Sequence, residues 1–224
     1  MPSLRPAATT VLAAPLPVLF AAGADLALLS TEEQARAASF RQLADQRRSI
    51  AAHWLKRQAL ARLTGQAPDT LRFSGDAQGK PHLAAPFAPA FNISHAGDWV
   101  ALALGRQATL GVDVEEARSD ALWAEVMPAI RAPEDAAVTS LHLWTAKEAV
   151  LKQLGSGFLG DPQEITIRMR HAGGFVAHTP LGARRGAWRA ADGRHLLAVA
   201  SPAPIWWRIC PEAKQLHRAL AALI

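Results

Sequence analysis

The sequence predicts an α+β fold made of two similar halves that pack against each other. Half of the 224 residues are hydrophobic, which is enough for a substantial core and argues against disorder. Helical patterns followed by strand-like segments occur twice along the chain, and no run of Gly, Ser or Pro is long enough for an open linker. We therefore expect a pseudo-twofold arrangement of an N-terminal subdomain at 1–108 and a C-terminal subdomain at 109–224.

The first element is expected in the apolar stretch Val11–Ala24. Together with Arg5 this stretch has some features of a secretory signal, but Pro15 and Pro17 interrupt the apolar run that a signal helix uses. Leu16 to Phe20 suit a buried starting strand. No other stretch approaches the ~20 apolar residues that a membrane span requires.

A long helical region comes next. Ser30 and Glu33 have the spacing of a capping box, and the region runs, with a break near Asp45, to the stop signal Thr64–Gly65. Its buried face is predicted to carry Phe40, Leu43, Ile50 and Trp54. The expected helix is amphipathic and strongly cationic, because its basic residues are predicted to lie largely on other faces: Arg36, Arg41, Arg47, Arg48, Lys56 and Arg57.

The remaining elements are read from alternation, periodicity and turn glycines. Strands are predicted in the first half at Thr70–Phe73, Ala90–Ser94 and Trp99–Leu104, and at the start of the second half at Thr109–Glu115. The second half is predicted to contain helices at Ala121–Ile130 and Glu134–Leu154, strands at Ile165–Met169, Gly174–Ala177 and Leu196–Ala200, and a closing helix at Glu212–Leu223.

Charge and cysteine content limit the classes of function. The net charge of +5 points to anionic partners, and it is unevenly distributed. Seven basic residues face one acidic residue between Arg36 and Arg62, whereas seven acidic residues face two basic ones between Gly111 and Asp135. Cys210 is the single cysteine, which excludes an intrachain disulfide and a CxxC-type zinc site and favours a reducing cytoplasm.

Asp113 and Glu115 alternate with Val112 and Val114 in the segment Gly111–Glu115. On a strand, this alternation sends both carboxylates to one face. Proteins hold Mg²⁺ through one or two carboxylates together with phosphate oxygens and water, and no cluster of His or Cys favours a softer metal. For this segment by itself, the alternative is a solvated strand edge.

The segment Trp144–Lys152 has helical spacing that places Trp144, Glu148 and either Leu151 or Lys152 along one face. Glu148 is a candidate third metal ligand or general base, and Lys152, one turn later, can neutralise phosphate charge. The alternative is an exposed ion pair between these two residues, which would contribute about 0.3–0.5 kcal/mol to the helix.

Two shorter segments complete the set. Phe91–His95 ends a strand in a hydroxyl and an imidazole, where side chains often meet a ligand, so His95 is a candidate phosphate contact. The alternative is a polar boundary residue, and no Ser-His-Asp order makes Ser94 a nucleophile. Gly79–Pro81 predicts a turn from which Lys80 can approach a nucleotide.

Taken in order, these four segments resemble the signature of the 4'-phosphopantetheinyl transferase superfamily, in particular its pseudo-dimeric, surfactin-synthetase-activating type, which activates nonribosomal peptide and polyketide synthases. The resemblance covers roughly Glu32 to Ala200 and implies a cofactor cleft between two similar halves. It also implies a Mg-dependent enzyme that transfers the 4'-phosphopantetheine arm of coenzyme A to a serine of an apo acyl or peptidyl carrier protein. The serine hydroxyl would attack the β-phosphate, and 3',5'-ADP would leave.

The resemblance also implies roles for individual residues. Asp113, Glu115 and Glu148 would hold Mg²⁺ beside the pyrophosphate, and Glu148, Lys152 and Asp113 form the expected catalytic set, with Glu148 as the candidate base. The expected cofactor-binding residues are Arg48, Ser49, Lys80, Pro81, Ser94, His95, Asp113, Glu148 and Lys152.

Two features depart from the family pattern. Met127–Arg131 lacks the paired phenylalanines often found before the second helix, so carrier docking is expected to differ. Ser156 stands near a position where many relatives have another basic residue, which removes one expected phosphate contact.

The expected partner is a carrier protein with an acidic helix, which the positive charge of this chain would attract. We expect a cytoplasmic monomer that binds neither nucleic acid nor membrane. Two alternatives stay open at this point. One is a nucleic-acid-binding module that uses the Arg36–Arg62 helix. The other is a different magnesium phosphotransferase acting on a nucleotide, against which the absence of a Gly-rich P-loop counts.

Overall fold

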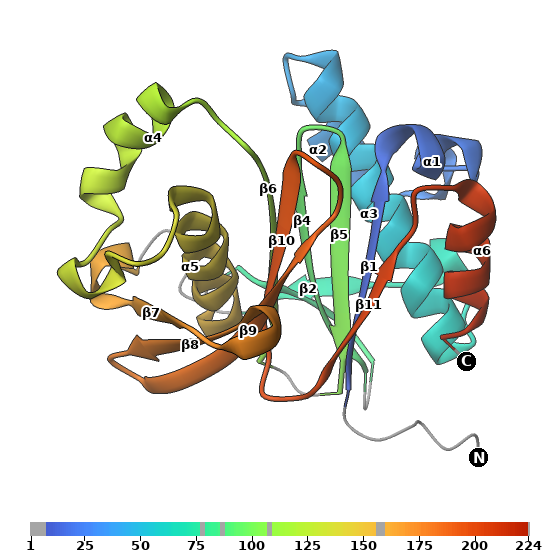
Figure 1. Cartoon of the computed structure of the whole chain (residues 1–224). Coiled ribbons are helices and arrows are strands. Elements are labelled where there is room, and N and C mark those ends of the chain that lie inside the picture. The colour runs from blue at the N-terminus through green and yellow to red at the C-terminus, as the bar shows by residue number, and fades with distance from the viewer. Residues whose placement is uncertain (1–7, 77–78, 86–87, 107–108, 156–159, 224) are drawn as a thin grey trace.

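Two sheets, the first mixed and the second antiparallel, lie side by side at the centre of the protein, with helices on their outer sides (Figure 1). The structure is a computed structural model that describes residues 8–76, 79–85, 88–106, 109–155 and 160–223. Helices α1, α3 and α6 cover the outer side of the first sheet, and α5 covers the second sheet from the opposite side of the molecule (Figure 1). This layered arrangement confirms the predicted α+β class with a sheet in each half.

The first sheet has the strand order β11-β1-β5-β4 and is formed mainly by the N-terminal half. Strand β1 pairs antiparallel with β5, and β5 pairs antiparallel with β4. A separate two-stranded ribbon is formed by β2 and β3. The elements of this half are β1 Thr9–Pro15, α1 Leu16–Ala21, η1 Leu26–Leu28, α2 Thr31–Ala38, α3 Leu43–Thr64, η2 Pro68–Thr70, β2 Phe73–Gly75, β3 Pro81–Leu83, β4 Ala90–Ala96 and β5 Trp99–Gly105.

The second sheet has the strand order β6-β10-β9-β8-β7, and every pairing in it is antiparallel. Helix α5 packs against this sheet and on strand β6. The elements are β6 Gly111–Glu116, α4 Asp120–Val126, η3 Met127–Ala129, η4 Pro133–Asp135, α5 Ser140–Leu154, η6 Pro162–Glu164, β7 Thr166–Met169, η7 His171–Gly173, β8 Gly174–Thr179, β9 Gly182–Ala190, β10 His195–Ala200, β11 Ile205–Ile209 and α6 Ala213–Ala221.

The end of the chain returns to the first sheet. Strand β11 pairs in parallel with β1, from Thr9 opposite Ile205 to Ala13 opposite Ile209. Helix α6 then packs its buried Leu216 and Leu220 into the core beneath α1 and α3. The last segment of the sequence is therefore part of the first sheet and of its helical layer.

Three apolar clusters hold these layers together. One lies between the first sheet and α1, α3 and α6, and another lies between the second sheet and α5. The third joins the two sheets, because Val11 and Ala101 from the first sheet contact Val112, Val114 and Leu197 from the second. Burial of these side chains at the junction fixes the two halves against each other. Each of the larger side chains contributes about 1.5–3 kcal/mol relative to an exposed position.

The predicted break in the helical region is confirmed, and it lies between the end of α2 at Ala38 and the start of α3 at Leu43. Ser30 caps α2 as its spacing predicts: its hydroxyl accepts from the Glu33 backbone N–H, and the Glu33 carboxylate accepts from the Ser30 backbone N–H. At the other end, Gly65 has φ +72°, the left-handed conformation that ends many helices.

The prediction that α3 directs its basic residues away from the core is wrong at two positions. Lys56 and Arg57 are 2% and 1% exposed, and both bind the carboxylate of Glu33 from α2, at 2.5 and 2.6 Å. Lys56 also lies over the ring of Phe73, with Nζ 3.7 Å from its centre. Glu33 therefore compensates two buried charges and ties α2 to α3. Leu43, predicted to be buried, is 68% exposed because it lies in the first turn of α3.

Other predicted boundaries also differ. Leu16 to Phe20 form helix α1 instead of a strand, because Pro17 fits the first turn of a helix and Leu16 and Leu19 share its buried face. The strand predicted at Thr70–Phe73 is displaced: a 3-10 helix ends at Thr70, and strand β2 starts only at Phe73. Helix α5 starts at Ser140 rather than at Glu134, since the buried Asp135 holds the preceding segment in its own turn. Sequence patterns did not predict β1, β3, β9 and β11.

The stretch Val11–Ala24, which has some features of a secretory signal, forms part of β1 and α1 and lies in the core. None of the helices within the described residues has the length and apolar character needed to cross a membrane.

Candidate functional site

The predicted acidic site lies where β4, β6 and α5 meet, at the junction of the two halves (Figure 1). Strands β4 and β6 belong to different sheets and are joined by side chains. Asn92 on β4 accepts a hydrogen bond from the Val112 backbone N–H on β6, at 2.9 Å. Ser94 on β4 lies 2.8 Å from the carboxylate of Asp113. Alternation along β4 places Asn92 and Ser94 on the same side, facing β6.

Asp113 is the centre of the site and is 3% exposed. One of its oxygens, Oδ1, accepts from the Lys152 ammonium on α5 at 2.6 Å and from the Ser94 hydroxyl. Its other oxygen, Oδ2, is buried and has no hydrogen-bond partner among the described residues. Burial raises the pKa of Asp113, and the positive charge of Lys152 opposes this effect.

Glu115 and Glu148 lie next to Asp113. Alternation on β6 puts Glu115 on the same face as Asp113, and the Trp144 indole N–H of α5 donates to it at 3.0 Å. Glu148 lies one helical turn from both Trp144 and Lys152, so it faces β6 between these two contacts. Burial raises the pKa of Glu148, and so do the negative charges of Asp113 and Glu115. The three carboxylates predicted as a set thus share one electrostatic environment.

These residues fit a hard divalent cation. Three partly or fully buried carboxylates repel one another, and an unpartnered buried oxygen such as Asp113 Oδ2 is a ready ligand. Within the described residues, no three His, Cys, Asp or Glu side chains are already gathered closely enough to form a metal site. Two of the carboxylates are engaged elsewhere, Asp113 by Lys152 and Glu115 by Trp144 and Arg118. The three-ligand set therefore stays a prediction.

Positive groups form one rim of the site. Arg48 on α3 donates to the carbonyl of Gly97, in the turn between β4 and β5, and forms an ion pair with Asp45. His95 is exposed at the end of β4. Neighbouring protein groups remove part of the water around its ring, and this desolvation lowers the pKa of His95. The positive charges of Arg48 and Lys152 lower it further. This rim is suited to the phosphates of a cofactor.

The turn beneath Arg48 is supported from the second half. The Asp192 carboxylate binds the Trp99 indole N–H at 2.8 Å and the ring of His195 at 3.0 Å. An added Cβ on Gly97 would lie 2.5 Å from His195 Nε2, so this turn accepts only glycine. Asp192 and His195 gave no signal in the sequence, because Trp99 and Gly97, which they support, are distant from them along the chain.

The other predicted cofactor-binding residues are more dispersed. Lys80 extends to α5 and β6, where its ammonium donates to the carbonyls of Lys152 and Leu110 at 2.9 and 3.0 Å. It thereby binds one carbonyl in the last turn of α5 and one just before β6. Pro81 is exposed next to it, at the start of β3. Ser49 is buried in α3, and its hydroxyl has no partner within the described residues. Ser156 lies outside the described residues.

Comparison with known proteins places this geometry in a family. Residues 20–107 match the N-terminal model of 4'-phosphopantetheinyl transferases, and residues 109–200 match the model of the 4'-phosphopantetheinyl transferase superfamily. The chain belongs to the 4'-phosphopantetheinyl transferase superfamily. The two matched regions meet between the two sheet-forming halves, where β4, β6 and α5 enclose the site.

Curated relatives agree with the assignment to the 4'-phosphopantetheinyl transferase superfamily. A Synechocystis protein named as a candidate 4'-phosphopantetheinyl transferase is 31% identical over 152 residues, which is 62% of each chain. A Bacillus subtilis 4'-phosphopantetheinyl transferase is 26% identical over 80% of this chain and 84% of its own. The Bacillus pumilus enzyme psf-1 is 29% identical over 68% of this chain and 69% of its own.

One residue of the helical motif has a structural role in this member of the 4'-phosphopantetheinyl transferase superfamily. Lys147 is 1% exposed and pairs at 2.6 Å with Asp135, which is 0% exposed. Its ammonium also donates to the carbonyls of Ile130 and Pro162. Lys147 therefore anchors α5 to the preceding loop and points away from Glu148, whose side chain faces β6.

Proposed function

We propose that the chain transfers the 4'-phosphopantetheine arm of coenzyme A to a serine of an apo carrier protein by means of the site between β4, β6 and α5. The single observation that carries this proposal is the buried contact of Asp113 with Lys152, placed between Glu115 and Glu148 at the junction of the two halves. The family assignment supports the reaction, and the ion pair between Lys152 and Asp113 supports the proposed location of the site.

In the proposed reaction, the serine hydroxyl of the carrier attacks the β-phosphate of coenzyme A. The bond between this phosphorus and the bridging oxygen of the 3',5'-ADP moiety breaks, and the carrier keeps a phosphodiester. Lys152 and Arg48 would stabilise negative charge on the phosphate oxygens. Glu148 is the candidate acceptor of the serine proton, but a carboxylate that holds a metal ion tightly is a poor base, so its role as a metal ligand takes precedence in this proposal.

Mg²⁺ would be held by Asp113, Glu115 and Glu148. When bound, it would neutralise charge on the pyrophosphate oxygens. The support on the protein side is the free Oδ2 of Asp113 and the mutual repulsion of the three carboxylates. Arg48, Ser49, Ser94, His95, Lys80 and Pro81 are the proposed residues that contact the rest of coenzyme A.

We further propose two subdomains divided at 108/109, which the boundary between the two matched regions supports, with β11 and α6 returning from the second half to the first sheet. The apolar junction within one chain already joins the two halves, which suits a monomer. The buried, unpaired Cys210 suits a reducing compartment such as the cytoplasm.

The nucleic-acid alternative loses its support. It relied on a free cationic face along α3, but Lys56 and Arg57 are buried against Glu33, and Arg48 is paired with Asp45.

The test is intact mass spectrometry of an apo carrier protein incubated with the enzyme, coenzyme A and Mg²⁺. We expect the carrier to gain the mass of one phosphopantetheine group. Asp113→Asn and Glu148→Gln are expected to reduce the rate at least about 100-fold, as for the loss of a main electrostatic contribution. Glu164→Gln, an exposed carboxylate distant from the site, is the matched control and keeps the wild-type rate. Wild-type rates in both site variants would contradict the assignment.

A further inference from the structure

The segment that forms strands β7, β8 and β9 has a positive charge excess as large as the net charge of the whole protein. From Thr166 to Ala190 the sequence contains five arginines, two histidines and no acidic residue. The complete chain has 24 basic and 19 acidic residues, so the rest of it carries 19 of each and is balanced. The excess of five positive charges in this segment thus equals the net charge of the whole chain, and the excess between Arg36 and Arg62 is balanced by acidic residues elsewhere.

The sheet register gathers three of these arginines on one face. Arg168 on β7 and Arg185 on β9 both lie opposite Val176 of β8, so the three side chains form one row. Arg189 lies four residues after Arg185 on β9 and shares the same face. All three arginines are exposed. We name Arg168, Arg185 and Arg189 the arginine face.

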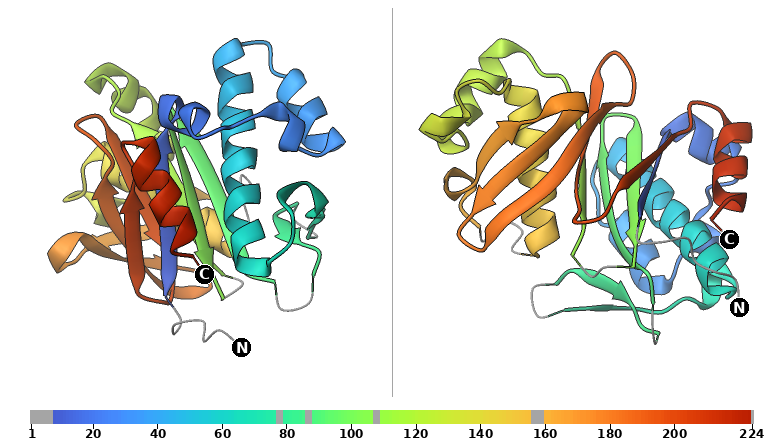
Figure 2. Two further views of the ribbon diagram at one scale, coloured as in Figure 1. Left: turned by 90° about the vertical axis from the view of Figure 1, so that its right-hand side faces the viewer. Right: turned by 60° about the horizontal axis from the view of Figure 1, so that its bottom comes forward.

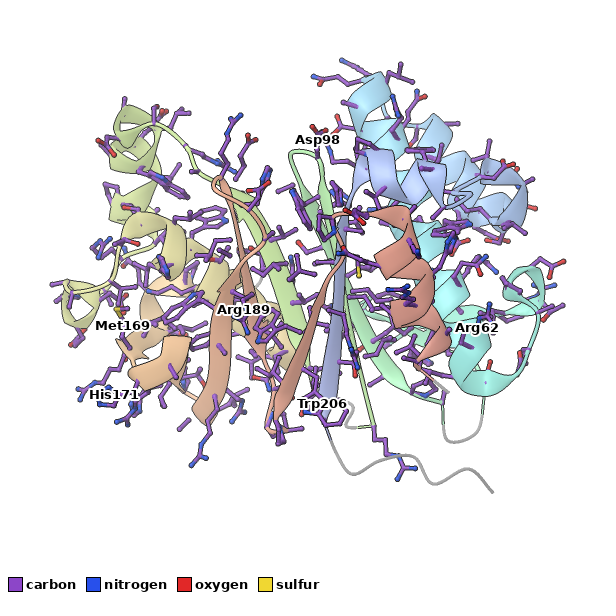
Figure 3. All side chains as sticks on the ribbon, turned by 45° about the vertical axis from the view of Figure 1, so that its right-hand side comes forward. Arg62, Asp98, Met169, His171, Arg189 and Trp206 are labelled. Atoms are coloured by element: carbon purple, nitrogen blue, oxygen red, sulfur yellow. The ribbon has the colours of Figure 1, made fainter. Side chains whose placement is uncertain are left out.

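The opposite face of these strands is covered. Ile167, Phe175 and Trp188 point into the core beneath α5, so the arginine face is the side of the sheet away from this helix. The β7–β9 part of the sheet lies open in Figure 2, and Figure 3 shows Arg189 on the surface of β9, far from Arg62 at the end of α3.

The charge of the arginine face is not compensated within the described residues. None of its three arginines takes part in an ion pair there, whereas Arg48, Lys56, Arg57, Lys147 and Lys152 all do. An exposed cluster of one sign, on an otherwise neutral molecule, gives the protein a strongly one-sided field. Such a field attracts an acidic partner and orients it before contact.

We propose that the arginine face is an electrostatic docking surface for an acidic surface of the carrier polypeptide, separate from the carrier segment that contains the modified serine. This inference rests on the proposed function. A protein partner suits this face better than single-stranded nucleic acid, because the aromatic side chains of these strands, Phe175 and Trp188, are buried on the other side and offer no stacking surface.

The location of the arginine face determines which kinetic constant it affects. Asp113 and Glu148 lie on the α5 side of the second sheet and at its β6 edge, whereas the arginine face lies on the far side at the β7–β9 edge. The arginines therefore act on encounter and binding of the carrier and do not touch the reacting phosphate. The KM for the carrier depends on them, and kcat does not.

The experiment compares two triple variants with the same change in charge. Arg168→Gln, Arg185→Gln and Arg189→Gln together neutralise the arginine face. Arg62→Gln, Lys214→Gln and Arg218→Gln neutralise three exposed cations on the α3 and α6 side. Transfer to an isolated apo carrier domain of net negative charge is measured from low to high salt, and thermal unfolding of both variants checks that they fold.

At low salt we expect the arginine-face variant to lose about 5- to 10-fold in kcat/KM through a higher KM, and to lose the salt dependence of the wild type. The control variant is expected to stay within about twofold of the wild type. Transfer to a short, uncharged serine peptide should be equal in all three proteins. Equal kcat/KM of both variants with the acidic carrier overturns the inference.

Failure of the proposed function has a different result, because the wild type would then transfer to neither the carrier domain nor the peptide. Two binding measurements cover other partners. If phosphatidylglycerol vesicles or a single-stranded DNA oligonucleotide bind the wild type and not the arginine-face variant, while carrier kinetics are unchanged, the arginine face belongs to that partner and the inference is wrong.

Discussion

Gly111 sets the distance between strand β6 and helix α5, and its replacement by alanine tests whether this distance controls the site. An added Cβ would lie 2.1 Å from the carbonyl oxygen of Ala149 and 2.5 Å from the backbone nitrogen of Gln153. Both are backbone atoms of α5, so no side chain can move aside. Since an ordinary contact begins near 3.4 Å, the helix must retreat by about 1.3 Å from the strand.

This displacement would act directly on the proposed chemistry. Lys152 and Glu148 are on α5, and the 2.6 Å contact of Lys152 with Asp113 crosses the same interface. We expect Gly111→Ala to lower the free energy of unfolding by about 1–3 kcal/mol, as for other overpacked cores. This corresponds to a decrease in Tm of about 2–4 °C for each kcal/mol in a chain of this size. A misplacement of about 1 Å is expected to reduce the transfer rate about 100-fold.

The assay combines scanning calorimetry with intact mass spectrometry of the carrier. Gly193→Ala is the matched control, because an added Cβ there would meet nothing within 4 Å. Wild-type Tm and transfer rate in Gly111→Ala would refute the packing argument. A lower Tm with full transfer would refute the link between the position of α5 and the site.

Two further predictions concern buried ion pairs, which are costly to break from one side. Glu33→Gln leaves Lys56 without its counter-charge and is expected to cost about 3–5 kcal/mol at neutral pH. Burial works against ionisation of Glu33, but the hydrogen bond from His53 and the charge of Lys56 lower its pKa below the usual 4.5. A lowered pKa gives stability that is present above pH 4.5 and is lost as the pH falls. The stabilities of wild type and Glu33→Gln are therefore expected to converge in acid, and a constant difference in chemical denaturation from pH 7 to 3 would contradict this. Lys147→Met leaves the fully buried Asp135 unpaired, and we expect a loss of about 3–5 kcal/mol by urea unfolding; a loss below 1 kcal/mol would show that the pair contributes little.

Local patterns predicted the elements that carry the site. The capping box at Ser30, the alternation of Asp113 and Glu115 with valines, and the helical spacing of Trp144, Glu148 and Lys152 each depend on residues close together in the sequence. Such patterns are readable because strand and helix periodicity fix which neighbours share a face. The same holds for the order of motifs that pointed to the family.

Contacts between distant residues were not predictable in this way. Lys56 and Arg57 were expected on an outer face of α3, because nothing local shows that Glu33, more than twenty residues earlier, would fold back against them. Strand β11 could not be predicted from local patterns either, because it pairs with β1, which lies at the other end of the chain.

The sequence by itself predicted the α+β class from composition and from periodicities of two and 3.6 residues, and it indicated the family through the order of its motifs. Only the tertiary structure decided which charges are free. It pairs Lys152 with Asp113, buries Lys56 and Arg57, and leaves the arginines of β7 and β9 open to solvent. The physical reason is that the state of a charge depends on the partners and the water around it, and these are set by the packing of segments far apart in the chain.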